Sequence, residues 1–97
     1  MAITTITRFH AAAGREDDLR TLVTAGRNRM RTADGCTSFE LLQDESDSGA
    51  MIFIQIWASH EAHDRAFAER IIKTGHLDKV LGAIDEPIVQ HSYQAAP

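Results

Sequence analysis

An almost unbroken apolar run at residues 51–57 constrains this chain more than any other stretch. Side chains alternate between the two faces of a strand. Isoleucines at three alternate positions therefore share one face, and Phe53, Gln55 and Trp57 share the other. A strand that is apolar on both faces must be covered on both. Helices of the chain itself can supply one cover, but a chain of 97 residues is too short to supply the second.

The remaining sequence predicts three more strands and three helical segments. The further strands are expected at residues 3–10, 36–43 and 88–93, and the helical segments at about 16–30, 60–73 and 77–84. The first helix carries an apolar stripe at helical spacing that includes Gly26, which leaves room for close approach to the sheet or for something between the two. The order β-α-β-β-α-β with right-handed crossovers predicts one α+β domain over residues 1–97, a ferredoxin-like four-stranded antiparallel sheet with helices on one face.

The other face of this sheet would carry the isoleucines of the third strand. Such an apolar face exceeds what a soluble monomer exposes. Two copies packed sheet against sheet would bury it, so we expect a homodimer, in which each subunit keeps a cavity between its own sheet and helices.

Composition narrows the function classes. The net charge of −4 and the pI of about 5.6 argue against a nucleic-acid partner, which requires a concentrated basic patch. No apolar run approaches the roughly 20 residues that span a bilayer, and no signal peptide is recognisable. The single cysteine, Cys36, forms no internal disulfide and favours a cytoplasmic location. His60 and His63 have the spacing of a ligand pair but lack a third ligand, so no metal site is predicted.

Four segments in order resemble one family. FHAAAGREDDLRTLV resembles the strand-Gly-helix opening of antibiotic biosynthesis monooxygenase domains, and DGCTSFELLQD resembles their second strand. FIQIWASHEA resembles the third strand with its Trp, and GHLDKVL resembles the His-containing segment after it. The resemblance implies a dimeric α+β barrel. It also implies a monooxygenase that oxidises an aromatic or quinol-type substrate with O2 and needs neither metal nor flavin.

His76, Trp57 and Gln55 are the expected catalytic residues. A cofactor-free oxygenase must take a proton from its substrate, and imidazole suits this step. Burial and a helix N-terminus would both keep His76 neutral. Trp57 could stack on an aromatic ligand, and Gln55 could bind a substrate oxygen. Each also has a structural alternative: His76 could merely pack the short helix, and Trp57 could belong to the core.

Five more side chains are expected to contact the substrate, two from the aromatic and apolar walls and three with polar groups. They are Phe53, His63, Phe67, Arg70 and Tyr93. Tyr93 could instead belong to the contact between subunits, and Arg70 could only extend along the surface of its helix.

Two other functions stay open. An isomerase of a small phosphorylated carbonyl compound would use the same His and an Arg such as Arg70. A dimeric module that binds a ligand without changing it is favoured by Gln55, which stands where the family commonly has an acid.

Overall fold

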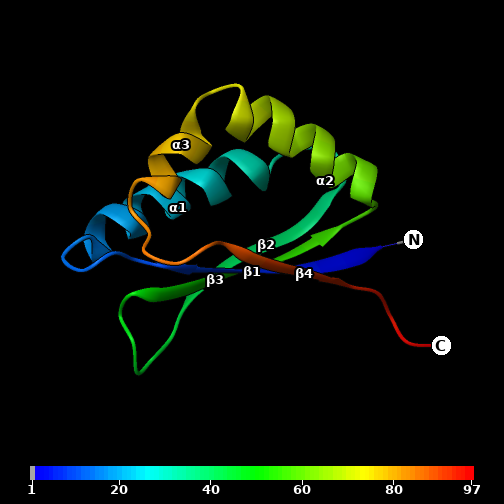
Figure 1. Cartoon of the computed structure of the whole chain (residues 1–97). Helices are drawn as coiled ribbons and strands as arrows, with labels where there is room; N and C mark the ends of the chain where they lie inside the picture. The colour runs from blue at the N-terminus through cyan, green and yellow to red at the C-terminus, as the bar shows by residue number, and fades with distance from the viewer. Residues whose placement is uncertain (1) are drawn as a thin grey trace.

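The computed structural model describes residues 2–97 and places three helical segments and a π-helical turn on one face of a sheet (Figure 1). In chain order the elements are β1 (Ile3–His10), α1 (Glu16–Met30), β2 (Cys36–Gln43), β3 (Ala50–Trp57), α2 (His60–Phe67), the π-helix η1 (Ala68–Ile72), α3 (His76–Leu81) and β4 (Val89–Tyr93). The sheet order is β2-β3-β1-β4, and every neighbouring pair is antiparallel. This is the predicted ferredoxin-like α+β fold. In the described part of the chain, no helix is long and apolar enough to cross a membrane.

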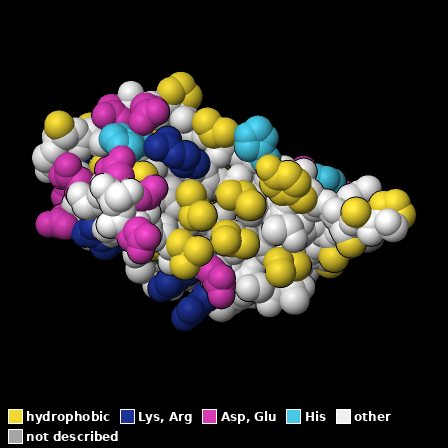
Figure 2. Space-filling model, turned by 90° about the horizontal axis from the view of Figure 1, so that it is seen from below, with side chains coloured by type: hydrophobic (Ala, Val, Ile, Leu, Met, Phe, Trp, Pro, Cys, Tyr) yellow, Lys and Arg dark blue, Asp and Glu magenta, His cyan; other side chains and the backbone are white. Residues whose placement is uncertain are grey.

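The two faces of β3 are as the alternation predicted. Phe53, Gln55 and Trp57 are buried beneath the helices, whereas the three alternate isoleucines are half-buried on the open face. Hydrophobic side chains of other strands join them there, and Figure 2 shows them as a patch on the face away from the helices. The register contributes Ile6 of β1, Leu42 of β2 and the β4 residues Val89 and Tyr93 to this open face.

The helix α1 has the start and the buried face that the sequence predicted. Three acids in its first turn complement the helix dipole. Leu19, Val23, Gly26 and Met30 are its buried residues, at the spacing of one helical face. Since Leu19 and Val23 have almost no exposed surface, this face is the main cover of the sheet.

The second helical segment differs from the expectation of one α-helix over residues 60–73. It begins as predicted, because the Ser59 hydroxyl accepts a hydrogen bond of 3.1 Å from the N–H of Ala62. The α-helix then ends at Phe67 and continues as the π-helix η1, where the N–H of Lys73 bonds the carbonyl of Ala68 at 3.0 Å. The wider turn absorbs an additional residue, which apolar spacing does not reveal. It keeps Ile71 buried against the sheet side and leaves Ile72 exposed.

His10, at the end of β1, joins two loops through carboxylates. Its Nδ1 lies 2.8 Å from Asp85 and 3.3 Å from Glu86, both in the segment before β4. Its Nε2 lies 3.1 Å from Asp47 in the β2–β3 connection, and Arg8 faces the same Glu86 at 3.7 Å. Hydrogen bonding to Asp85, assisted by Asp47, raises the pKa of His10 above its ordinary value.

We expect His10→Gln to destabilise the protein at pH 5–6 and to have little effect near pH 9. A raised folded-state pKa means that the cation stabilises the fold fully below the unfolded pKa of about 6.5, and that this contribution is lost as pH rises through the folded value. Thermal unfolding of both proteins across this range measures the difference. The exposed His60→Gln is the control; an equal loss at both pH values in His10→Gln would contradict the charge-based explanation.

Candidate functional site

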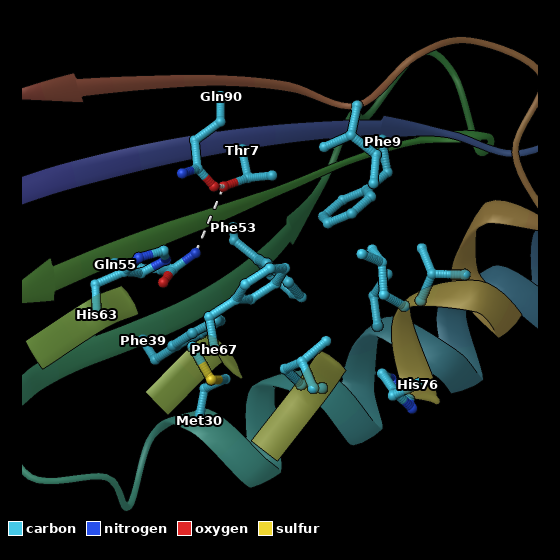
Figure 3. A pocket seen from close by; sticks show the side chains of 16 residues that line it. Thr7, Phe9, Met30, Phe39, Phe53, Gln55, His63, Phe67, His76 and Gln90 are labelled. Atoms are coloured by element: carbon cyan, nitrogen blue, oxygen red, sulfur yellow. Dashed lines mark hydrogen bonds between the residues drawn. The ribbon is translucent and has the colours of Figure 1, made fainter. Parts of the chain in front are cut away.

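A cavity of about 100 Å³ lies between the helix-facing side of the sheet and the helices (Figure 3). Its walls are mainly apolar and come from both layers, among them Phe9, Phe39, Phe53, Phe67, Ile71 and Val80. Phe53 is central, because the rings of Phe9 and Phe39 meet it edge-on at centroid distances of 4.9 and 4.8 Å. Five polar side chains interrupt these walls: Thr7, Gln55, His63, His76 and Gln90.

Three of the polar side chains form a row across β3, β1 and β4 that continues to Trp57. The indole Nε1–H of Trp57 donates to Gln55 Oε1 at 2.8 Å. Gln55 Nε2 donates to the Thr7 hydroxyl at 3.5 Å, and this hydroxyl donates to Gln90 Oε1 at 2.8 Å. Gln55 and Thr7 are buried, whereas Gln90 is exposed, so the row leads from the core to solvent.

Trp57 fixes which way the Gln55 amide points. An indole N–H only donates, so the atom opposite it must be the amide oxygen. The amide nitrogen is thereby directed toward Thr7 and the cavity wall. Trp57 itself is fully buried, and the cavity wall does not include it. Its contact with the site is indirect, through Gln55 and through the ring of His63.

His63 lies at the same end of the cavity as Gln55 (Figure 3). Its ring meets Trp57 edge-on at 5.4 Å and stacks on Phe67 at 5.9 Å, one helical turn further on. Its Nδ1 lies 3.0 Å from the carboxylate of Asp64. These contacts fix the plane of the imidazole, which is buried.

His76 lines the opposite end of the cavity, with the phenylalanine side chains between it and Gln55 (Figure 3). Its Nε2 lies 2.7 Å from the carbonyl oxygen of Leu22, so this nitrogen carries the proton and donates. Nδ1 then keeps the lone pair when the ring is neutral. Burial lowers the pKa of His76, which favours this neutral form.

The ring of His76 lies beside Gly26 of α1. A Cβ at this position would lie 3.4 Å from His76 Nε2 and 3.7 Å from its Cδ2. The sequence indicated room beside this glycine, and the space is filled by the imidazole and the cavity next to it.

Arg70 and Tyr93 lie outside the cavity, contrary to the expectation that they would reach it. The Arg70 guanidinium donates to the carbonyl of Arg29 and to the Thr32 hydroxyl, each at 2.9 Å, and so closes the end of α1. Tyr93 pairs with Thr4 on the open face of the sheet, because strand alternation gives the cavity side to Gln90 and Ser92.

Thr7 and Gln90 are cavity residues that the sequence analysis did not assign. Thr7 could have been found from alternation, since it shares a face with Phe9, which lies two residues further along β1. Gln90 had no such signal, because every residue of β4 is exposed and its face follows only from the register with β1.

The family model for antibiotic biosynthesis monooxygenase matches residues 2–77. A search among curated proteins found no significant match. Solved structures match over nearly the whole chain. Rv0793 from Mycobacterium tuberculosis is 20% identical with a TM-score of 0.89, and the match covers 100% of this chain and 97% of that one.

Two more solved structures share this fold. SnoaB from Streptomyces nogalater, described as a cofactor-independent oxygenase, is 16% identical with a TM-score of 0.83 over 99% of this chain and 94% of that one. PA3566 from Pseudomonas aeruginosa is 23% identical with a TM-score of 0.83 over 98% and 95%. These structures support the fold, and the family model covers most of the sequence. The chain belongs to the antibiotic biosynthesis monooxygenase family.

Proposed function

We propose that this protein is a cofactor-independent monooxygenase that oxidises an aromatic, quinol-type substrate with O2. The observation that carries this proposal is the hydrogen-bonded row from Trp57 through Gln55 and Thr7 to Gln90, because its last three side chains lie in the wall of a mainly apolar cavity. An apolar cavity favours an aromatic ring, and a few fixed polar groups orient it. Family membership and the oxygenase SnoaB, which has the same fold, support the type of reaction.

In the proposed reaction the substrate supplies all the electrons. A hydroquinone and O2 give a hydroxyquinone and water: one oxygen atom forms a C–O bond, and the other leaves as water with two hydrogens of the substrate. The first step moves a phenolic proton to a base, because the phenolate gives an electron to O2 more readily than the phenol. The protein accordingly has to accept a proton, stabilise an oxyanion and exclude water.

Two polar side chains of the cavity, His76 and Gln55, have a chemical part in this proposal. His76 accepts the proton at Nδ1, since its Nε2 is held by the Leu22 carbonyl. Gln55 donates an N–H to the substrate oxygen, and Trp57 holds Gln55 in the orientation that makes this donation possible.

The remaining cavity residues hold the ring. Phe53 and Phe67 contribute the aromatic walls, and the buried His63 packs on Phe67 beside them. Arg70 and Tyr93 have no part in substrate binding here, because their side chains lie elsewhere.

The phosphate isomerase is supported less well by the cavity. Among the residues that the structure describes, no Lys or Arg lines it, and Arg70 is engaged by α1. A phosphate group would be buried there without a cationic partner, which is costly. A module that binds its ligand without changing it would use the same cavity. Only a measurement of turnover distinguishes this hypothesis from the oxygenase.

We propose in addition that two copies pair through the open face of the sheet. Ile54 and Ile56 lie on this open face. Figure 2 shows hydrophobic side chains gathered into a patch on it, with charged side chains mainly toward one end of the molecule. A patch of this kind on a domain of 10.7 kDa is typical of a protein interface. In analytical ultracentrifugation the protein should therefore have the mass of two chains, and a monomer at micromolar concentration would contradict the pairing.

We propose a cytoplasmic location as well. The single half-buried cysteine, Cys36, suits a reducing compartment.

Oxygen uptake by metal-free protein in the presence of a chelator tests the function. We expect hydroquinones to be consumed with one atom of isotopically labelled O2 entering the product. His76→Gln should lower kcat by about 10²–10⁴-fold, the usual contribution of a general base.

The control is His60→Gln, which changes an exposed histidine at the start of α2 and should leave the rate unchanged. Full activity of His76→Gln would remove the proposed base. Thermal stabilisation by quinols without any turnover would replace the oxygenase by the binding module.

A further inference from the structure

His63 has one engaged nitrogen and one free nitrogen. Its Nδ1 lies 3.0 Å from the Asp64 carboxylate. An ionised carboxylate only accepts, so Nδ1 carries the proton of the neutral ring and Nε2 keeps the lone pair. Among residues 2–97, Nε2 has no hydrogen-bond partner, and no fully buried side-chain nitrogen lacks one. Nε2 therefore has open space beside it, which the cavity that His63 lines supplies.

Two aromatic side chains hold the imidazole in this orientation. The ring of Phe67 stacks on it with an angle of 10° between the planes, and the Trp57 ring meets it edge-on at 90°. Turning the imidazole over would take the Nδ1–H away from Asp64 and would break the hydrogen bond. The lone pair of Nε2 is thereby kept at the end of the cavity where Gln55 lies (Figure 3).

His63 and His76 differ in how they exchange protons with water. Nε2 of His76 faces the Leu22 carbonyl, and a backbone carbonyl accepts a hydrogen bond without taking up the proton. A proton that Nδ1 of His76 accepts can therefore leave only by way of the cavity. Nδ1 of His63 faces a carboxylate whose side chain is 76% exposed, so Asp64 joins this imidazole to solvent.

The proposed reaction requires two proton acceptors. Formation of a hydroxyquinone breaks one O–H and one C–H bond of the hydroquinone, and His76 accounts only for the O–H proton. Once O2 has bonded to a ring carbon, that carbon still carries its hydrogen. A base removes this proton, the C–H electron pair becomes the second bond of the new C=O group, and the O–O pair goes to the outer oxygen. Two protons leave the substrate and two reach the outer oxygen, which departs as water.

We infer that His63 is the second base: it takes the proton of the ring carbon at Nε2, and Asp64 fixes its tautomer and links it to water. The inference rests on the proposed function and gives His63 a chemical role in addition to its packing on Phe67. His63 is then a catalytic residue. Asp64, which does not line the cavity, is a positioning residue.

A hydroquinone with deuterium on its ring carbons distinguishes the two bases. His63→Gln should lower kcat by about 10²-fold or more, within the range for a general base, and should make C–H cleavage the slowest step. His76→Gln instead slows removal of the phenolic proton. We therefore expect the deuterium isotope effect on kcat to be larger in His63→Gln than in His76→Gln. An equal or smaller isotope effect in His63→Gln would overturn the inference.

Asp64→Asn tests the positioning residue without touching the core. The amide occupies the same exposed position but does not take up a proton. This variant should lower kcat about fivefold, since a charge exposed to water contributes little, and its isotope effect should exceed that of the control. The control is Glu69→Gln, which removes an exposed carboxylate of the same helical segment. Equal kcat and equal isotope effects in these two variants would refute the part assigned to Asp64.

Nitrogen NMR of histidine-labelled protein tests the inference without turnover. We expect the neutral His63 ring to carry its proton on Nδ1, and the Nε2 signal to shift when a hydroquinone binds in the absence of O2. A proton on Nε2 of the neutral ring, or no response of Nε2 to the quinol, would overturn the inference.

These results are distinct from the oxygen-uptake result. A response of Nε2 without oxygen consumption refutes the oxygenase and leaves His63 as a contact of the ligand. Oxygen consumption with equal isotope effects in His63→Gln and His76→Gln keeps the oxygenase and refutes the second base.

Discussion

Gly35→Ala is expected to destabilise the protein by about 2–5 kcal/mol. Gly35 has φ +88°, in the left-handed region that side chains with a Cβ rarely adopt. A Cβ there would also lie 2.6 Å from the Cβ of Ala62, in the first turn of α2. The backbone carbonyl of Gly35 bonds the N–H of Ala58 at 2.7 Å, so the segment cannot move aside without disturbing the end of β3. Urea unfolding measures the loss.

Gly14→Ala separates the two causes. Gly14 has φ +80°, but nothing lies within 4 Å of a Cβ built there. Gly14→Ala should therefore lower the free energy of unfolding only by the cost of the left-handed backbone conformation, about 1–2 kcal/mol. Adding Ala62→Gly to the Gly35→Ala variant removes the methyl group that the new Cβ would meet. After the cost of Ala62→Gly alone is subtracted, the double variant should regain about 1–3 kcal/mol of the lost free energy of unfolding. Equal losses at Gly14 and Gly35 would show that the contact with Ala62 has no energetic weight.

Trp57→Ala is expected to cost about 3–5 kcal/mol, the range for removing a large buried aromatic side chain. Trp57 has no exposed surface. Its ring contacts His63, and its N–H satisfies Gln55. Because small domains have a total stability of only about 5–15 kcal/mol, this variant should be close to unfolding.

Trp57→Phe tests whether the indole N–H of Trp57 orients the Gln55 amide in the cavity wall. It keeps an apolar ring but removes the donor, so Gln55 Oε1 loses its partner at a cost of about 1–3 kcal/mol. The amide of Gln55 is then free to reverse. In a folded Trp57→Phe protein we expect kcat for quinol oxidation to fall, because Gln55 no longer has a fixed orientation toward the substrate oxygen. An unchanged kcat would mean that Gln55 is oriented by something other than the indole.

The sequence predicted the sheet well because its information is local. In β3 one period of two residues decides both faces, and the isoleucines lie on the open face as that period requires. The bounds of β1 and β2 were predicted correctly for the same reason. The π-helix η1 was missed, since a turn that is wider by one residue changes hydrogen bonding without a composition of its own.

The candidate site was harder to predict from the sequence than the sheet, because it depends on strand register and on packing between the helices and the sheet. Gln55, Phe53 and Phe67 were assigned to the cavity wall by periodicity, and they line it. Arg70 lies on the same side of its helical segment as apolar residues, which suggested that it reaches the cavity. Its guanidinium instead donates a hydrogen bond to the Arg29 carbonyl of α1, a contact that only the tertiary structure reveals. Gln90 lies on a strand that is exposed throughout, where no pattern distinguishes the two faces.

The wide turn at η1 has an evolutionary consequence. A turn with one additional residue is a point where the chain can gain or lose an amino acid while the segments before and after it stay in place. Ile71, which lines the cavity, belongs to this turn. A single deletion at residues 68–72 would therefore reshape the space above the sheet without altering strand pairing. Insertions and deletions at this one point offer a route by which descendants of such a protein could come to accept ligands of another size.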